Sequence, residues 1–248
     1  MAQIFFILLV IVPLARLALA ILQPELLKHI EGERTRKMIA RAFGTPRHNK
    51  RVSDIGNRVA EAAGIEATFW VVPAPVMNAA TLPHGHVLVW SGLERHTQGD
   101  DDMLAGVLAH ELGHLHHEHY LKRIERWALL LFAFGVFGRA WIGPLVRNVA
   151  SRIVLRGFGR SDELQADDWA FDYLSKSGFD PRGLARLFET LRPFEGPSGL
   201  LGTHPQASLR QQRVLERLGL PFEEPEQTDG TGRKVIPFDE ARSRSEER

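Results

Sequence analysis

The residues best suited to chemistry are two histidines four positions apart, His110 and His114, and a glutamate, Glu111, directly after the first. On an α-helix, positions i and i+4 lie on one face, so both imidazoles can reach one zinc ion. Glu111 is rotated off that face, where it can accept a proton from an attacking water without binding the metal. The pattern predicts a zinc-dependent hydrolase. The alternative is a solvated, histidine-rich helix face.

A catalytic zinc site normally has a third protein ligand and one open position. The best candidate is Glu163, which stands four residues before Asp167 on a predicted helix. Like charges on one helix face favour a nearby cation. Asp167 is then expected to accept a hydrogen bond from a ligand imidazole. On spacing alone, an acidic start to a solvent-exposed helix explains the pair as well, because the helix dipole also favours it.

The chain has 11 histidines, and five of them fall within residues 110–119. A fourth protein ligand would close a zinc site to water. We therefore expect the three that follow the motif to be solvated or to support the site: His116, His117 and His119. His84 and His86 are predicted to be strand or turn residues and not ligands.

Hydrophobic periodicity and helix-ending glycine and proline residues predict an α+β fold, mainly α with a small β-sheet. Short β-rich runs predict the strands, at residues 68–72, 78–82 and 87–90. The helices are expected at about residues 49–63, 103–126, 161–178, 181–191 and 208–218. The helix that carries His110 and His114 is the centre of this zincin-type core.

The chain begins with an apolar run from Ile4 to Leu22, broken by Pro13 and Arg16. This run predicts a hydrophobic membrane-anchoring helix within residues 1–22. Basic residues follow the run and none precedes it, which places the catalytic domain in the cytoplasm. Because Ala18-Leu19-Ala20 resembles a cleavage site, the alternative is a cleaved signal at residues 1–20 and an exported, periplasmic protein.

The rest of the chain is expected to form one catalytic domain and a tail. Residues 23–220 are the predicted metallopeptidase domain, with an apolar segment at 127–146 that is expected to face a membrane. Residues 221–248 are polar and predicted to be disordered. The net charge of +1 gives no basic surface for nucleic acid. The absence of cysteine excludes disulfides, thiolate metal sites and cysteine nucleophiles.

Three motifs in this order resemble those of the membrane-associated, HtpX-like and CAAX prenyl endopeptidase family of gluzincin zinc metallopeptidases, over about residues 49–218. They are the His110–His114 helix preceded by Leu108-Ala109, the Glu163…Ala166-Asp167 helix, and Thr203-His204-Pro205 followed by Arg210. The resemblance implies one zinc ion bound by His110, His114 and Glu163, and a bacterial inner-membrane location. It also implies that Glu111 is the general base and later acid, that Asp167 supports a ligand, and that His204 donates to the oxyanion.

The resemblance extends to Asn78-Ala79 and to Leu82-Pro83-His84-Gly85, which match the stretch before the family's substrate-facing edge strand. It implies that Asn78 and Ala79 contact an extended peptide. The family often has glycine where His84 stands. By the residues alone, His204-Pro205 is also explained as a turn, and Arg210 either pairs with an acid near the site or is a surface charge.

These features together predict a zinc endopeptidase that acts on membrane-associated or misfolded polypeptides and contacts lipid through its N-terminal segment. The alternative is a non-proteolytic membrane protein that keeps the zinc fold as a binding or chaperone module. The intact Glu111 argues against that alternative, because a binding module has no need of a general base.

Overall fold

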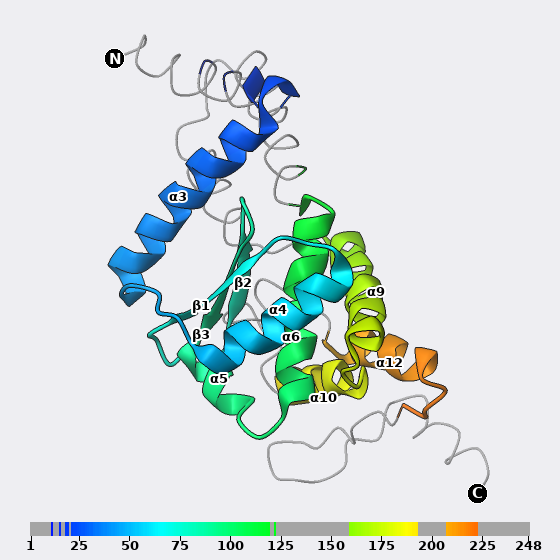
Figure 1. Ribbon diagram of the computed structural model, residues 1–248. Coiled ribbons are helices and arrows are strands. Elements are labelled where there is room, and N and C mark those ends of the chain that lie inside the picture. The colour runs from blue at the N-terminus through cyan, green and yellow to red at the C-terminus, as the bar shows by residue number, and fades with distance from the viewer. Residues whose placement is uncertain are drawn as a thin grey trace, which may run out of the picture.

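The computed structural model describes residues 21–119, 159–192 and 207–222, together with positions 11, 15, 18, 19 and 122. Helices surround one small sheet, as Figure 1 shows. The elements in chain order are α3 (Pro24–Phe43), α4 (Lys50–Ala63), β1 (Thr68–Val72), β2 (Ala79–Leu82), β3 (His86–Trp90), α5 (Ser91–His96), α6 (Asp101–His116), α9 (Arg160–Ser177), α10 (Arg182–Leu191) and α12 (Ala207–Arg217). The predicted α+β class is confirmed.

The sheet has the strand order β1-β3-β2, so β2 lies at one edge. β1 and β3 run parallel, whereas β2 and β3 form an antiparallel hairpin in which Leu82 pairs with His86. The hairpin turn contains His84 and Gly85, which have φ angles of 71° and 84°. A glycine adopts this left-handed region more easily than a histidine does. His84 therefore occupies a turn, as predicted, at a backbone position that suits glycine.

Helix α6 is the centre of the core and packs against α4, α9, α10 and the edge strand β2. Its first turn is capped by Asp100, whose side chain accepts a hydrogen bond from the Met103 backbone N–H at 2.9 Å. Every residue from Met103 to His114 is buried. A helix buried on all sides holds its polar side chains in fixed surroundings, so the two motif histidines are placed by packing and not by solvent.

The close approach of α6 and α9 depends on Gly113, inside the histidine motif. A Cβ atom there would lie 2.8 Å from the Ala166 carbonyl oxygen. The missing side chain allows the backbones to meet beside Glu163 and Asp167, which flank Ala166 on α9. The predicted helix with Glu163 and Asp167 is thereby brought against the predicted histidine helix.

Helix α6 ends at His116, whereas the prediction continued it to about Arg126. The prediction is wrong for the residues directly after His116. Glu118 has a left-handed φ of 51°, which no α-helix contains. Its carboxylate pairs with Lys28 of α3, with the Lys28 Nζ and Glu118 Oε1 atoms 2.6 Å apart. No glycine or proline marks this stop, and a contact with a distant helix accompanies it. Helices α3 and α5 were not predicted from the sequence.

Several predicted features lie outside the described residues. They are most of residues 1–22, the apolar segment 127–146, His204 and nearly all of the tail 221–248. Among the residues that the structure describes, no helix has both the length and the apolar content needed to cross a membrane.

Candidate metal centre and active site

Three buried side chains from α6 and α9 converge on one point. The Nε2 atoms of His110 and His114 lie 3.1 Å apart. The two carboxylate oxygens of Glu163 lie 3.5 Å from His110 Nε2 and 3.4 Å from His114 Nε2. Among the described residues, this is the one group of three or more ligand-type side chains close enough to share an ion. The structure therefore brings together the three residues that the sequence analysis predicted as metal ligands.

The spacing of these donors fits zinc. Tetrahedral ligands at about 2.0–2.1 Å from zinc lie about 3.3 Å from one another, which the three observed separations bracket. Two imidazoles and one carboxylate also form a donor set that zinc accepts, with a fourth position left for water or substrate. Burial is nearly complete, since Glu163 is 1% exposed and His114 is 2% exposed.

The charges around the site also favour a cation. Three carboxylates are buried here, on Glu111, Glu163 and Asp167, and the Arg210 guanidinium is buried with them. With both histidines neutral, these four groups carry a net charge of about −2. Uncompensated charge is costly in a buried site. A divalent cation would balance it.

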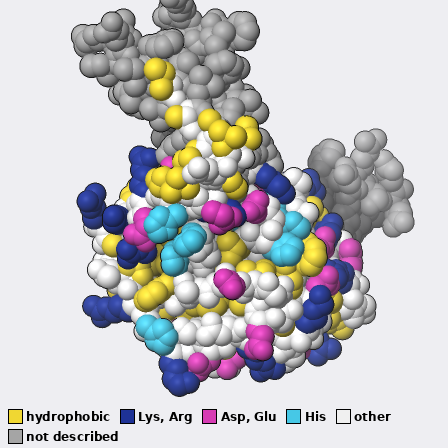
Figure 2. Space-filling model, turned by 45° about the horizontal axis from the view of Figure 1, so that its top comes forward, with side chains coloured by type: hydrophobic (Ala, Val, Ile, Leu, Met, Phe, Trp, Pro, Cys, Tyr) yellow, Lys and Arg dark blue, Asp and Glu magenta, His cyan; other side chains and the backbone are white. Residues whose placement is uncertain are grey.

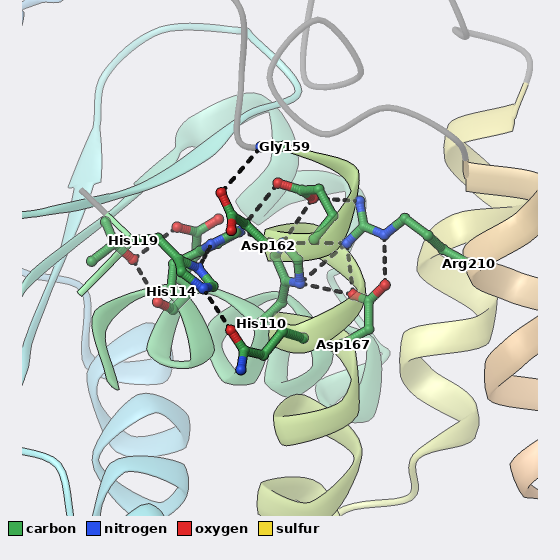
Figure 3. A network of polar contacts seen from close by, with 11 residues as sticks. His110, His114, His119, Gly159, Asp162, Asp167 and Arg210 are labelled. Carbon is green, nitrogen blue, oxygen red and sulfur yellow. Dashed lines mark hydrogen bonds and ion pairs between the residues drawn. The ribbon is translucent and has the colours of Figure 1, made fainter. Parts of the chain in front are cut away.

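Asp167 contacts His110 at Nδ1, the ring nitrogen that is not directed at the other two proposed ligands. Figure 3 shows the Asp167 carboxylate between His110 and Arg210. His110 Nδ1 lies 2.8 Å from Asp167 Oδ1, and Arg210 donates two hydrogen bonds of 2.7 Å to the same carboxylate. Arg210 Nη1 also lies 2.9 Å from Glu163 Oε2. Arg210 is therefore an acid-pairing residue of the site and not a surface charge.

These contacts shift the acid–base properties of both groups. Burial and the Arg210 charge act to lower the pKa of His110, but hydrogen bonds to Asp167 and Glu163 outweigh them and raise it to about 9. For Asp167, burial acts to raise the pKa, but Arg210 and His110 lower it overall. In the absence of a metal, His110 is the proton-holding group of the site.

His114 has a different partner behind it. Its Nδ1 atom lies 2.8 Å from Nδ1 of His119, and His119 Nε2 lies 3.0 Å from the Gln165 side-chain oxygen. His119 is 1% exposed, and burial lowers its pKa. Of the two histidines between them, His116 packs its ring on Trp169, with ring centroids 4.9 Å apart. The His117 ring stacks on the His119 ring, with centroids 5.4 Å apart.

Glu111 faces the edge strand. The Thr81 hydroxyl lies 2.8 Å from Glu111 Oε2 and 2.8 Å from the Glu111 backbone carbonyl oxygen. Thr81 belongs to β2, so this contact fixes the glutamate beside the edge of the sheet. Thr81 was not predicted from the sequence. Its position two residues after Ala79, on the same side of a strand, was the available signal.

A cleft of about 540 Å³ opens beside the site. Its lining includes Thr81 and His114, together with the hairpin turn at residues 83–86 and the end of α6. Figure 2 shows histidine and acidic side chains gathered on this side of the molecule. His84 and His86 line the cleft and are not part of the ligand group. The site thus adjoins a space that a polypeptide segment can enter.

The family model for peptidase family M48 matches residues 46–218, which include every described residue of the site. The chain belongs to peptidase family M48. Metalloprotease YcaL of Escherichia coli is 26% identical over 186 residues, covering 71% of this chain and 72% of YcaL. The mitochondrial metalloendopeptidase OMA1 of Arabidopsis thaliana is 31% identical over 159 residues, covering 62% of this chain and 32% of OMA1.

A third M48 relative is a putative beta-barrel assembly-enhancing protease of Vibrio cholerae, 30% identical over 190 residues, covering 68% of this chain and 38% of that protein. The chain thus spans most of YcaL but well under half of the other two. Membership of M48 confirms the predicted class, a zinc metalloendopeptidase, together with its cofactor and polypeptide substrates. The non-proteolytic alternative is not supported.

The raised pKa of His110 gives a pH prediction for zinc binding. Because this pKa lies above the ordinary 6.5, protonation stabilises the metal-free fold fully below about pH 6.5, and this stabilisation is lost as the pH rises through about 9. Zinc requires the neutral imidazole, so zinc affinity should rise with pH up to about 9. Titration calorimetry in two buffers of different protonation enthalpy should detect about one proton released per zinc near pH 7.5. Affinity independent of pH between 6.5 and 9 would contradict the assignment.

Proposed function

We propose that His110, His114 and Glu163 hold the zinc ion and that Glu111 is the general base of peptide hydrolysis. The observation that carries this proposal is the set of 3.1–3.5 Å separations between the two Nε2 atoms and the Glu163 carboxylate oxygens, with Glu111 on the same buried helix as the histidines. When bound, zinc polarises the scissile carbonyl and acidifies water. Asp167 orients His110 through the hydrogen bond at Nδ1, as second partners of zinc ligands usually do.

The hydrolytic steps follow from the positions of these groups. The Glu111 carboxylate accepts a proton from the attacking water as its oxygen bonds to the carbonyl carbon. The same carboxylate then returns that proton to the amide nitrogen as the C–N bond breaks. The Thr81 hydroxyl lies 2.8 Å from Glu111 Oε2, and this contact holds the carboxylate beside the edge strand. For His204, three positions before α12, we propose hydrogen-bond donation to the carbonyl oxygen that gains charge.

The substrate is proposed to bind as an extended strand along β2. This strand is paired on one side by β3 and lies at the edge of the sheet. Thr81 ties it to the general base, so a peptide added to its edge passes Glu111. Asn78 Oδ1 is buried and has no hydrogen-bond partner, which favours a donor from the substrate main chain. Asn78 and Ala79 therefore stay proposed substrate contacts.

For location, we propose that residues 1–22 anchor the enzyme at a membrane, with residues 23–220 as the catalytic domain in the cytoplasm and membrane-associated or misfolded proteins as substrates. Support comes from the apolar run from Ile4 to Leu22. Three large apolar side chains continue it along one face of α3 and its approach, Leu22, Leu26 and Ile30, and all are exposed. Hydrophobic side chains gather toward the top of the view in Figure 2, where the described part meets the grey residues.

The test combines metal content with proteolysis. Purified protein should contain about one zinc per chain, and a chelator should abolish casein cleavage, which added zinc restores. Glu163→Ala should lower zinc affinity by at least the 10–100-fold that loss of a supporting partner alone costs. Glu189→Ala, an exposed glutamate of α10, is the matched control and should bind zinc as the parent does. Chelator-resistant cleavage, or full zinc affinity in Glu163→Ala, would overturn the proposal.

A further inference from the structure

The two proposed histidine ligands of zinc are supported in chemically different ways. His110 contacts a carboxylate: its Nδ1 atom lies 2.8 Å from Asp167 Oδ1. His114 contacts a neutral group. Its Nδ1 atom lies 2.8 Å from His119 Nδ1, and His119 Nε2 lies 3.0 Å from the Gln165 side-chain oxygen. Figure 3 shows His119 and His114 side by side on the opposite side of the site from Arg210.

The geometry of this hydrogen-bonded series fixes where each proton lies. If His114 presents its Nε2 lone pair to the metal, its Nδ1 carries the hydrogen and must donate. The atom that faces it, His119 Nδ1, must then accept and carry no hydrogen. His119 consequently bears its proton on Nε2, which faces the Gln165 side-chain oxygen, an acceptor. Each of the three side chains thus has a defined donor or acceptor role in this series of hydrogen bonds, and each donated proton meets an acceptor.

A turn in the backbone makes this contact. Helix α6 stops at His116, and the left-handed residue Glu118 interrupts the helical path, so that the His119 ring contacts His114. The pairing of Glu118 with Lys28 of α3 accompanies this conformation. A straight continuation of α6 would put residues 114 and 119 on different faces, since five positions advance a helix by about 500°.

We propose that His119 is a positioning residue for the zinc ligand His114, acting as the acceptor that sets its tautomer and ring orientation, with Gln165 setting His119. The inference rests on the proposed function, because it takes His114 as a zinc ligand. Such outer partners raise the basicity of a ligand imidazole and typically contribute 10–100-fold to metal affinity.

Two substitutions at His119 separate positioning from packing. Asparagine places its Oδ1 atom where histidine has Nδ1, so His119→Asn keeps the acceptor but loses volume. Leucine fills the buried space but accepts no hydrogen bond, so His119→Leu keeps packing and loses the acceptor. Positioning predicts that zinc affinity falls about 10–100-fold in His119→Leu and less than about threefold in His119→Asn. A packing role predicts the opposite order.

Zinc affinity should be measured by competition with a chromogenic chelator, beside the visible spectrum of the cobalt-substituted protein. That spectrum should shift in His119→Leu and match the parent in His119→Asn, because it reports the ligand field directly. Zinc binding in His119→Leu equal to the parent would refute the inference. The reverse order of the two variants would refute it too.

Gln165 offers a second test that does not disturb the core, because its side chain is exposed. Gln165→Leu removes the outer acceptor and should weaken zinc binding severalfold, whereas Gln165→Glu keeps an acceptor and should bind at least as tightly as the parent. Gln212→Leu, on α12, is the control and should leave affinity unchanged. Equal affinities for the two Gln165 variants would count against the inference.

His114→Ala distinguishes a failure of the proposed zinc site from a failure of the role given to His119. If the parent protein binds no zinc, or His114→Ala binds it as the parent does, the proposed function itself fails. If the parent binds zinc, His114→Ala loses it, and His119→Leu keeps parental affinity, only the role given to His119 fails.

Discussion

Replacing Glu111 with glutamine should lower kcat/KM for casein-derived peptides by about 10²–10⁴ while zinc stays bound at one ion per chain. Glutamine has the shape of glutamate and can still accept the Thr81 hydrogen bond through its amide oxygen. The buried site, where Glu111 is 1% exposed, therefore keeps its packing. The amide cannot take a proton from water, so only the base is lost.

The measurement pairs steady-state kinetics with metal analysis of the same preparation. Glu94→Gln is a suitable control, since Glu94 is similarly buried, at 9% exposure, but belongs to α5 and not to the site. It should retain parental kcat/KM. Cleavage by Glu111→Gln at the parental rate would show that another group activates the water, and loss of zinc would show that Glu111 holds the metal.

Replacing Arg210 with methionine should destabilise the protein by about 3–5 kcal/mol, the cost of breaking a buried ion pair by removing one partner. Arg210 is 2% exposed and is bonded to both Asp167 and Glu163. Methionine still covers the Phe188 ring, over which the guanidinium now lies at 4.3 Å. The expected loss therefore comes from charge that is left without compensation and not from a cavity.

Arg213, three residues further along α12, provides the matched control. It pairs with Asp168 at 3.1 Å, but its side chain is 41% exposed. Exposed pairs contribute about 0–1 kcal/mol, so Arg213→Met should change stability by no more than that. Urea unfolding of the zinc-free proteins measures both. If the two variants lose the same stability, the buried cluster does not depend on Arg210 in the way that its contacts indicate.

The parts of the site that lie on single helices were predictable from sequence. His110 and His114 share a face because of helix periodicity alone, and Glu163 and Asp167 do so on α9 for the same reason. Helix boundaries with local signals were predictable too: Asn49 caps α4, and Gly64 and Gly178 end α4 and α9 in the left-handed conformation.

The features of the site that the sequence left open or did not indicate depend on contacts between elements distant in sequence. Thr81 meets Glu111 across 30 residues, and Arg210 meets His110 across 100. The early end of α6 has no glycine or proline to mark it, and Lys28 lies far from Glu118 in the chain. Such pairings depend on how helices and strands pack, which residue spacing along one element does not encode.

In the proposed mode of binding, the position of β2 at the edge of the sheet, with β3 on its other side, would let this peptidase select its targets. A chain whose amide groups are already satisfied in a helix or an inner strand has none to offer to that edge. Only a polypeptide segment whose backbone N–H and C=O groups lack hydrogen-bond partners can pair with that edge, whatever its side chains are. Folded proteins nearby would then escape cleavage because their backbone groups are already paired, whereas an unfolded chain would be cleaved.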